Sequence, residues 1–69
     1  MIPHQQRAVE EKAELLKKTL ALNDFIGVNP IFMTLPADEQ ERMKIQLDIM
    51  WQYVEILASR INAFPKDTK

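Results

Sequence analysis

The sequence predicts an all-α protein: an antiparallel two-helix hairpin with an apolar connector, assembling into a homo-oligomeric helical bundle. Three observations support this prediction. Residues 36–64 carry apolar side chains at alternating steps of four and three, the pattern of a helical-bundle seam. A second apolar stripe follows another side of the same residues, so a single partner helix cannot cover them. The third observation is the small size of the chain.

A chain of 69 residues forms one small domain. At this size a single core barely offsets chain entropy, and small scaffolds usually rely on a disulfide, a metal or association. The sequence contains no cysteine and a single histidine, His4, which excludes disulfides and disfavours the usual zinc sites. We therefore expect no cofactor, and self-association at least to a dimer.

The charge balance and the apolar runs limit the possible partners. The net charge of -1 provides no long-range attraction to the phosphates of nucleic acid. The first seven residues lack the apolar core of a signal peptide, and no apolar run approaches the length of a membrane span. We expect a soluble cytosolic chain without nucleic-acid or membrane partners.

Residues 3–26 form the first predicted helix. Pro3 suits the first turn, where its missing N–H would have no partner. Glu14 and Lys18 have the i, i+4 spacing of an ion pair and mark a solvated face. The predicted seam consists of Val9, Ala13, Leu16 and Leu20, with Ala8, Leu15 and Leu22 as an apolar flank.

Residues 27–35 form the predicted connector. Gly27 stands where a helix would end in a left-handed C′ residue. Asn29 and Pro30 are typical of an N-cap and first residue that open a short helical turn. Because the connector is unusually apolar, we expect it to pack at the closed end of the hairpin or against a neighbouring subunit.

Residues 36–64 form the second predicted helix, which begins at Pro36. Asp38 and Glu39 in its first turns complement the positive end of the helix dipole. Pro65 ends the helix, and residues 65–69 are expected to fray. The residues predicted for the oligomer interface are Met43, Leu47, Met50, Trp51, Val54, Leu57 and Ile61.

Catalytic and metal-binding constellations have little support in the sequence. Ser59 is the sole serine and His4 lies near the N-terminus, so a catalytic triad is not expected. One glycine cannot build a phosphate-binding loop. No glutamate has a histidine three residues later, which excludes the di-iron bundle pattern. We expect a protein that is not an enzyme and binds no metal.

Polar side chains interrupt the second apolar stripe of residues 36–64: Arg42, Gln46, Tyr53 and Arg60. Three explanations are open. The arginines can lay their stems on apolar surface with the charge in water. They can pair with Glu11, Asp24 or Glu39 across a subunit interface. They can also bind phosphate in an interfacial pocket, where Tyr53, Phe32 or Trp51 stacks on a base.

A longer pattern resembles a widespread family of small phage-encoded helical proteins, labelled as related to a crAss-like phage protein. The matching residues are Glu10-Glu11-Lys12, Leu16, Phe25-Ile26, Phe32, Leu35, Glu39-Gln40, Gln46-Leu47, Met50, Tyr53, Ile56-Leu57 and Arg60-Ile61. Members of that family include oligomeric sponges for the cyclic oligonucleotide signals of bacterial immunity. The resemblance implies a phage accessory protein in the cytoplasm of an infected bacterium.

Two functions follow as expectations. The preferred function is a noncatalytic phage counter-defence protein that sequesters a cyclic-oligonucleotide type of signal at subunit interfaces. Its predicted ligand-binding residues are Arg42, Gln46, Tyr53, Arg60 and Phe32. The alternative is a phage accessory protein that binds and modulates a host or defence protein through a helical surface.

Overall fold

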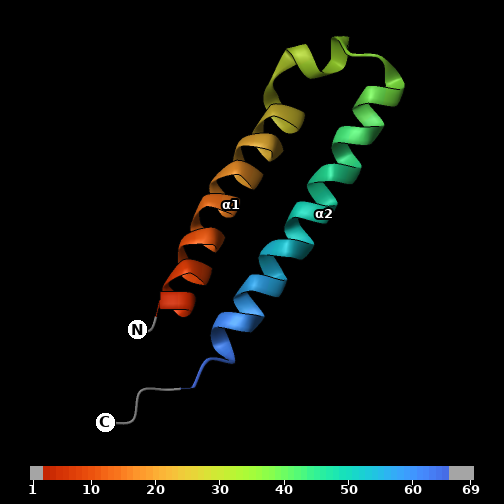
Figure 1. Ribbon diagram of the computed structural model, residues 1–69. Coiled ribbons are helices and arrows are strands. Elements are labelled where there is room, and N and C mark those ends of the chain that lie inside the picture. The colour runs from red at the N-terminus through yellow and green to blue at the C-terminus, as the bar shows by residue number, and fades with distance from the viewer. Residues whose placement is uncertain (1–2, 66–69) are drawn as a thin grey trace.

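A computed structural model describes residues 3–65, which form three helical elements. Helix α1 spans Pro3–Val28, the short 3-10 helix η1 spans Pro30–Thr34, and helix α2 spans Ala37–Asn62. The two long helices run in opposite directions, with η1 at the closed end (Figure 1). The fold is the all-helical hairpin that the sequence predicts.

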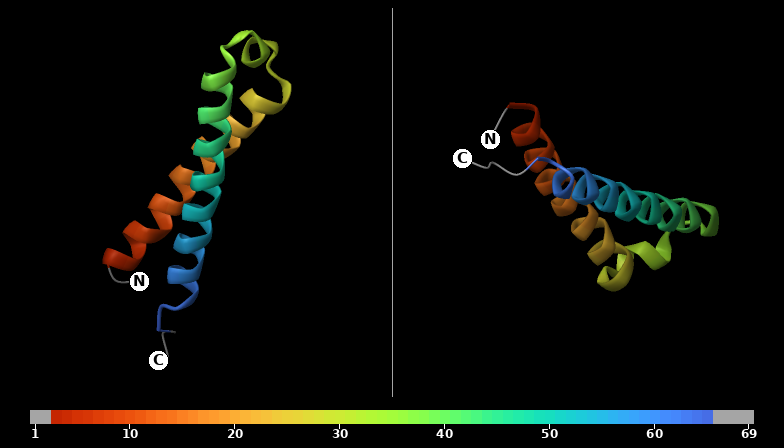
Figure 2. Two further views of the ribbon diagram at one scale, coloured as in Figure 1. Left: turned by 90° about the vertical axis from the view of Figure 1, so that its right-hand side faces the viewer. Right: turned by 90° about the horizontal axis from the view of Figure 1, so that it is seen from below.

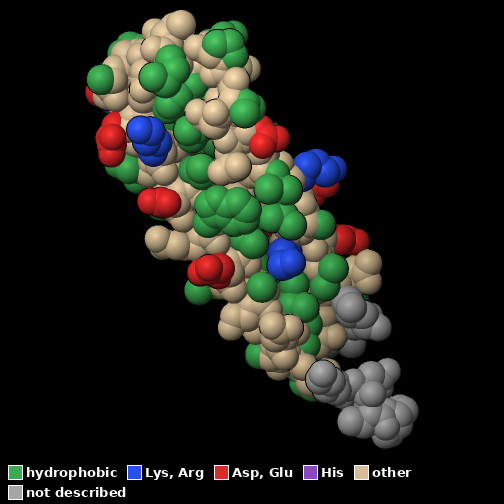
Figure 3. Space-filling model, turned by 180° about the vertical axis from the view of Figure 1, so that it is seen from behind, with side chains coloured by type: hydrophobic (Ala, Val, Ile, Leu, Met, Phe, Trp, Pro, Cys, Tyr) green, Lys and Arg blue, Asp and Glu red, His purple; other side chains and the backbone are tan. Residues whose placement is uncertain are grey.

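The hairpin is long and only one layer of helices thick. It measures 55 × 15 × 15 Å, and the two helices cross obliquely (Figure 2). On one face, apolar side chains gather along the middle, with charged side chains along both flanks (Figure 3). Because a closed core needs at least two layers of secondary structure, one copy leaves much apolar surface in contact with water.

A few side chains are fully enclosed between the helices. Leu57 and Thr19 are each 0% exposed, and Ala8 is 3% exposed. The Thr19 hydroxyl donates a hydrogen bond of 2.7 Å to the carbonyl oxygen of Leu15, one turn earlier. This bond satisfies the only polar atom of that side chain, so Thr19 can occupy an apolar interior without a desolvation penalty.

The interior face of α1 differs from the predicted seam. Ala8 and Thr19 are buried, whereas Ala13 and Leu20 are exposed. The helix is therefore turned so that the predicted flank, together with Thr19, faces α2. The other two seam residues, Val9 and Leu16, are half-buried at the edge of this face.

The seam of α2 lies at the hairpin's interior. Val54 and Leu57 are buried and Met43, Leu47, Met50, Trp51 and Ile61 are half-buried. Val54 and Leu57 are covered within the chain, so they have no surface left for another copy in this conformation. For the half-buried members, a role in an oligomer interface stays a prediction.

Gly27 does not end the first helix. No glycine among residues 3–65 has a positive φ, and the amide of Asn29 donates to the carbonyl of Phe25 at 3.2 Å. The helical hydrogen-bond ladder therefore continues past Gly27 to Val28. Helix α1 ends there because Pro30 has no N–H to donate and disfavours helical backbone at the residue before it.

The predicted turn after α1 is confirmed. Asn29 is the N-cap of η1, and its side-chain oxygen accepts a hydrogen bond of 2.9 Å from the amide of Ile31. Pro30 occupies the first helical position. Phe32 is 2% exposed and packs edge-to-face on Phe25, with ring centroids 6.2 Å apart. The connector is thus packed against the closed end of the hairpin.

Helix α2 is slightly shorter than predicted. Pro36 is its N-cap, without a side-chain cap bond, and the first turn contains Asp38 and Glu39. At the other end the amide of Ala63 donates to the carbonyl of Ser59 at 3.0 Å, which closes the last turn. Apart from Pro65, the predicted frayed tail lies outside the described residues.

Candidate functional site

The polar centre of the hairpin is a contact between its two long helices. The Tyr53 hydroxyl of α2 donates a hydrogen bond to a carboxylate oxygen of Glu11 on α1. Both side chains are exposed on one face, and Tyr53 is 42% accessible to solvent. Glu11 follows the buried Ala8 by three residues, which places its carboxylate at the edge of the interior where it reaches α2.

Arg60 lies two turns beyond Tyr53 on the same side of α2, and its charge acts on the Tyr53 hydroxyl. The hydrogen bond to Glu11 is the main cause that raises the pKa of Tyr53 above its ordinary value of 10.0. Desolvation and the negative charge of Glu11 add to this shift, whereas the positive charge of Arg60 opposes it. Tyr53 and Arg60, two of the predicted ligand-binding residues, therefore lie on the same side of α2, two turns apart. Together with Glu11 they form the Tyr53 cluster.

Arg42 lies in a separate cluster at the start of α2. Its guanidinium contacts Glu39 at 2.9 Å and Asp38 at 3.3 Å. All three side chains are substantially exposed, so each pair stabilises the helix by roughly 0.3–0.5 kcal/mol. Glu39, one of the three acidic residues considered as partners of the arginines, thus pairs with Arg42 inside one chain. We call this group the Arg42 cluster.

The predicted ligand-binding residues do not all meet within one chain. Arg42 and Arg60 are both on α2, eighteen positions apart, which corresponds to about 27 Å along the helix axis. Gln46 lies between them and contacts the sulfur of Met50 at 3.8 Å. One bound nucleotide cannot span from Arg42 to Arg60, so the predicted ligand-binding residues do not form one site within a single chain.

The aromatic candidates are placed differently from the prediction. Phe32 is 2% exposed and packed on Phe25, so it cannot stack on a base in this conformation. Its assignment as a ligand-binding residue is therefore wrong for the hairpin shown, because the connector uses the ring as its own core. Trp51 is half-buried and lies on the opposite side of the seam from Tyr53. Tyr53 is the exposed aromatic residue of the predicted set.

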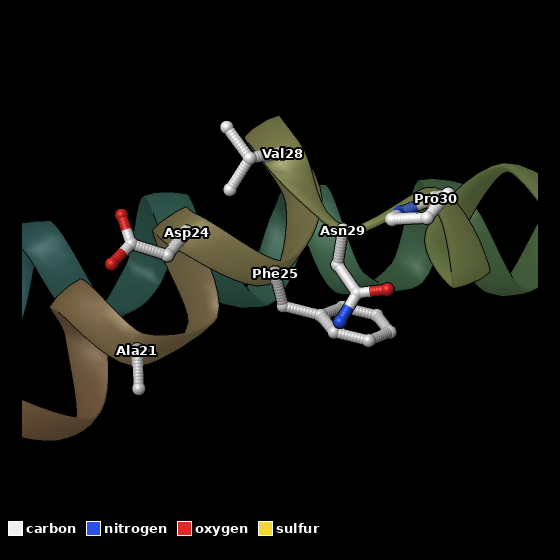
Figure 4. A pocket seen from close by; sticks show the side chains of 6 residues that line it. All are labelled: Ala21, Asp24, Phe25, Val28, Asn29 and Pro30. Carbon is white, nitrogen blue, oxygen red and sulfur yellow. The ribbon is translucent and has the colours of Figure 1, made fainter.

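A hollow of ≈ 510 Å³ lies at the junction of α1 and η1, away from both clusters. Its lining consists of Ala21, Asp24, Phe25, Val28, Asn29 and Pro30 (Figure 4). Phe25 and Asn29 point to one side of the helix, whereas Asp24 and Val28 point to the other (Figure 4). The one charged side chain is a carboxylate, which repels phosphate. This hollow therefore does not suit an anionic ligand.

The open end of the hairpin is closed by an aromatic contact. The rings of His4 and Phe64 meet edge-to-face with centroids 6.1 Å apart. His4 is exposed, but this contact gives it a packing role that the sequence did not indicate. Within residues 3–65, no group of three histidine, aspartate or glutamate side chains is placed to hold a metal ion. Neither described helix has the length and apolar character needed to cross a bilayer.

Fold and site together define a small all-α hairpin with exposed apolar side chains and two polar clusters, one at the start of α2 and one that joins α2 to α1. The chain belongs to the Sequestin family, whose family model matches residues 2–63. The name of the family suggests a sequestering function, in which a molecule is bound and withheld. Comparisons with curated proteins and with solved structures gave no match.

Proposed function

We propose that this chain is a phage counter-defence protein that sequesters a nucleotide signal of bacterial immunity in the cytoplasm of the infected cell. The signal class is the cyclic oligonucleotide, and the chain binds it without converting it. Membership of the Sequestin family supports the sequestering function. The resemblance to phage-encoded sponges supports the nature of the target.

The observation that carries this proposal is the placement of Tyr53 and Arg60 two turns apart on one exposed side of α2. A guanidinium provides up to five N–H donors for phosphate oxygens. The half-exposed ring of Tyr53, on the same side of α2, offers a surface on which a base can stack. The same face carries Ile49 and Ile56, which are 58% and 56% exposed and can cover the apolar edge of a ribose or base. Phosphate, base and sugar thus each have a matching group.

The carboxylate of Glu11 opposes the binding of an anion at this place. It accepts the hydrogen bond of the Tyr53 hydroxyl and so competes with a phosphate oxygen for that donor. A ligand phosphate at Arg60 must therefore displace the carboxylate or bind beside it. Removing the negative charge with Glu11→Gln should tighten binding several-fold, because the repulsion disappears while the side chain keeps its size.

The direct test is a calorimetric and thermal-shift screen of the purified protein against cyclic dinucleotides, cyclic trinucleotides and ADP-ribose derivatives. A ligand at one hundred times its Kd should stabilise the native state by about 2.7 kcal/mol. For a domain of this size, each kcal/mol corresponds to a rise in Tm of roughly 4–8 °C. The proposal requires at least one cyclic oligonucleotide to produce such a rise.

Matched variants then assign the site. Arg60→Ala should remove most of the ligand-induced rise in Tm. Lys44→Ala removes one positive charge from the same helix at an exposed position on a different side, so it should leave binding unchanged. Equal losses in both variants would mean that net charge, not the Tyr53 cluster, governs binding. If only ADP-ribose derivatives raise the Tm, the sequestering function would stand, but the assignment of the ligand as a cyclic oligonucleotide would be overturned.

A second candidate function rests on the connector. Val28, Ile31 and Met33 are 81%, 56% and 73% exposed, so the tip of the hairpin presents apolar side chains to water. A tip of this kind suits contact with another protein. Under this alternative, the chain binds and modulates a host or defence protein. A silent nucleotide screen, together with co-purification of one host protein that a Met33→Asp substitution abolishes, would favour it.

A further inference from the structure

The closed end of the hairpin carries apolar side chains beside a hollow. Val28, Ile31 and Met33 are each more than half exposed. Val28 also lines the hollow at the junction of α1 and η1, where Asp24 is the one charged side chain among mostly apolar walls. Asp24 and Val28 point to the same side of α1 (Figure 4). We call the three exposed apolar side chains and the hollow the tip surface.

Side-chain hydrogen bonds fix the backbone that displays the tip surface. The side-chain oxygen of Asn29 accepts a hydrogen bond of 2.9 Å from the amide of Ile31. The hydroxyl of Thr34 donates to the carbonyl of Ile31 at 2.6 Å. From α2, the side-chain amide of Gln40 donates to the carbonyl of Leu35 at 2.9 Å. A surface that is ordered before binding loses less conformational entropy when a partner docks on it.

The formal charges around the tip surface have one sign. Residues 19–41 contain four carboxylates and no lysine, arginine or histidine: Asp24, Asp38, Glu39 and Glu41. Arg42 pairs with Asp38 and Glu39, whereas no ion pair among residues 3–65 involves Asp24 or Glu41. The carboxylate beside the hollow is therefore available to a cation from outside the chain.

These charges decide which kind of partner fits. The phosphates of nucleic acid and anionic lipid headgroups are repelled by carboxylates, and so is an anionic nucleotide. Docking of two copies tip to tip would bring like charges together, which is unfavourable. A protein segment with both apolar and basic side chains matches the apolar surface and the carboxylate at once.

We propose that the tip surface docks a segment of another protein in which apolar side chains flank an arginine or lysine. The basic side chain enters the hollow, where its aliphatic stem packs on the apolar walls and its charged end binds the Asp24 carboxylate. The apolar side chains of the segment cover Ile31 and Met33. The docking stands on the tip surface alone, whereas any effect on the activity of the partner rests on the second candidate function.

Titration with two synthetic amphipathic helical peptides tests the docking. Both peptides carry leucine on one face, and the polar face carries arginine in one peptide and glutamate in the other. Methyl NMR spectra of the full chain report where each peptide binds. The arginine peptide should shift the resonances of Val28, Ile31 and Met33, and the glutamate peptide should leave them unchanged. Ile49 and Ile56, which are exposed on α2, serve as the reference for binding to any apolar surface.

Matched charge variants test the contact with the carboxylate. Asp24→Asn should weaken binding of the arginine peptide several-fold, because it removes the charge and keeps the size of the side chain. Asp48→Asn removes the same charge from an exposed position further along α2, so it should leave binding unchanged. Equal losses in the two variants would show that net charge alone attracts the peptide and would overturn the proposal.

The other outcomes are equally decisive. Shifts confined to Ile49 and Ile56, equal shifts from the glutamate peptide, or no shift from either peptide would each overturn the docking. A protein that binds a cyclic oligonucleotide but neither peptide would retain the sequestering function and lose the docking. Binding of the arginine peptide at the tip surface in a protein that responds to no nucleotide would support the docking and overturn the sequestering function.

Discussion

The Tyr53 hydroxyl and the Glu11 carboxylate join the two long helices although they are 42 residues apart in the chain. This hydrogen bond crosses the hairpin at an exposed face and brings an acid next to a tyrosine and an arginine. It therefore links the packing of α1 on α2 to the electrostatics of the Tyr53 cluster. The pKa of Tyr53 therefore reports both on the packing of α1 on α2 and on the charges around the hydroxyl.

Ultraviolet titration of the protein should show Tyr53 ionising above pH 10.0. Its raised pKa has the hydrogen bond to Glu11 as its main cause, so Glu11→Gln should move the titration back toward 10.0. Tyr53 is the sole tyrosine, which makes the assignment unambiguous. An unchanged midpoint in Glu11→Gln would show that Glu11 does not hold the hydroxyl in solution.

The same shift predicts how stability depends on pH. Because the pKa of Tyr53 is higher in the folded chain than in the unfolded one, the bond stabilises the fold at pH values below 10.0. That stabilisation is lost as the pH rises through the raised pKa. Urea unfolding between pH 8 and 12 should show this loss in the wild type, and Tyr53→Phe should lack the corresponding component.

Gly27→Ala should stabilise the hairpin. Gly27 has helical backbone without a positive φ, and a Cβ added there meets nothing within 4 Å. Replacing a helical glycine by alanine is worth about 0.5–1 kcal/mol, since alanine loses less backbone entropy on folding. Chemical denaturation followed by circular dichroism measures the change. Ala21→Gly, at an exposed position of the same helix, should cost a similar amount, whereas destabilisation by Gly27→Ala would indicate a left-handed glycine after all.

Leu57→Ala should destabilise the fold by about 2–5 kcal/mol, the range for buried leucines, because the side chain is fully enclosed. Val28→Ala serves as the control, since Val28 is 81% exposed and surface changes usually stay within about 0.5 kcal/mol. Urea midpoints at one fixed protein concentration give the comparison. Equal effects of the two substitutions would contradict the interior position of Leu57.

Asn29→Ala should loosen the connector. The Asn29 side chain caps η1 through the amide of Ile31, and loss of such a cap costs about 1 kcal/mol. Hydrogen exchange at the Ile31 amide should accelerate severalfold. Asn29→Ser keeps a capping oxygen and should retain most of the protection, while Asn23→Ala, at an exposed position, should have no effect on that amide.

Local signals in the sequence predicted much of this fold. Asn29 and Pro30 define a cap by their own chemistry, and the seam around Val54 and Leu57 follows from spacing alone. The prediction that the first helix ends at Gly27 was wrong. Glycine is common after helices, but here the helix ends because Pro30 has no N–H to donate. The exact end of a helix is hard to predict where two such signals, here Gly27 and Pro30, stand close together.

Contacts between the helices were harder to predict. Helix α1 has apolar residues on two neighbouring faces, and their spacing alone does not decide that α2 covers the face with Ala8 and Thr19. Glu11 could be placed beside Tyr53 only after that rotation was known. Phe32 was predicted both as part of a packed connector and as a ring that stacks on a ligand base, because the sequence does not show that Phe25 packs on it. The predicted ligand-binding residues of α2 share one side of the helix, but the distance along its axis separates Arg42 from Arg60.

Sedimentation equilibrium over a wide range of protein concentration tests the central claim most directly. One hairpin cannot cover its apolar stripes, so the protein should sediment at a mass of at least two 8.1 kDa chains, with dissociation and loss of helical structure together on dilution. A chain that stays fully helical as an 8.1 kDa monomer at the lowest measurable concentration would contradict the account.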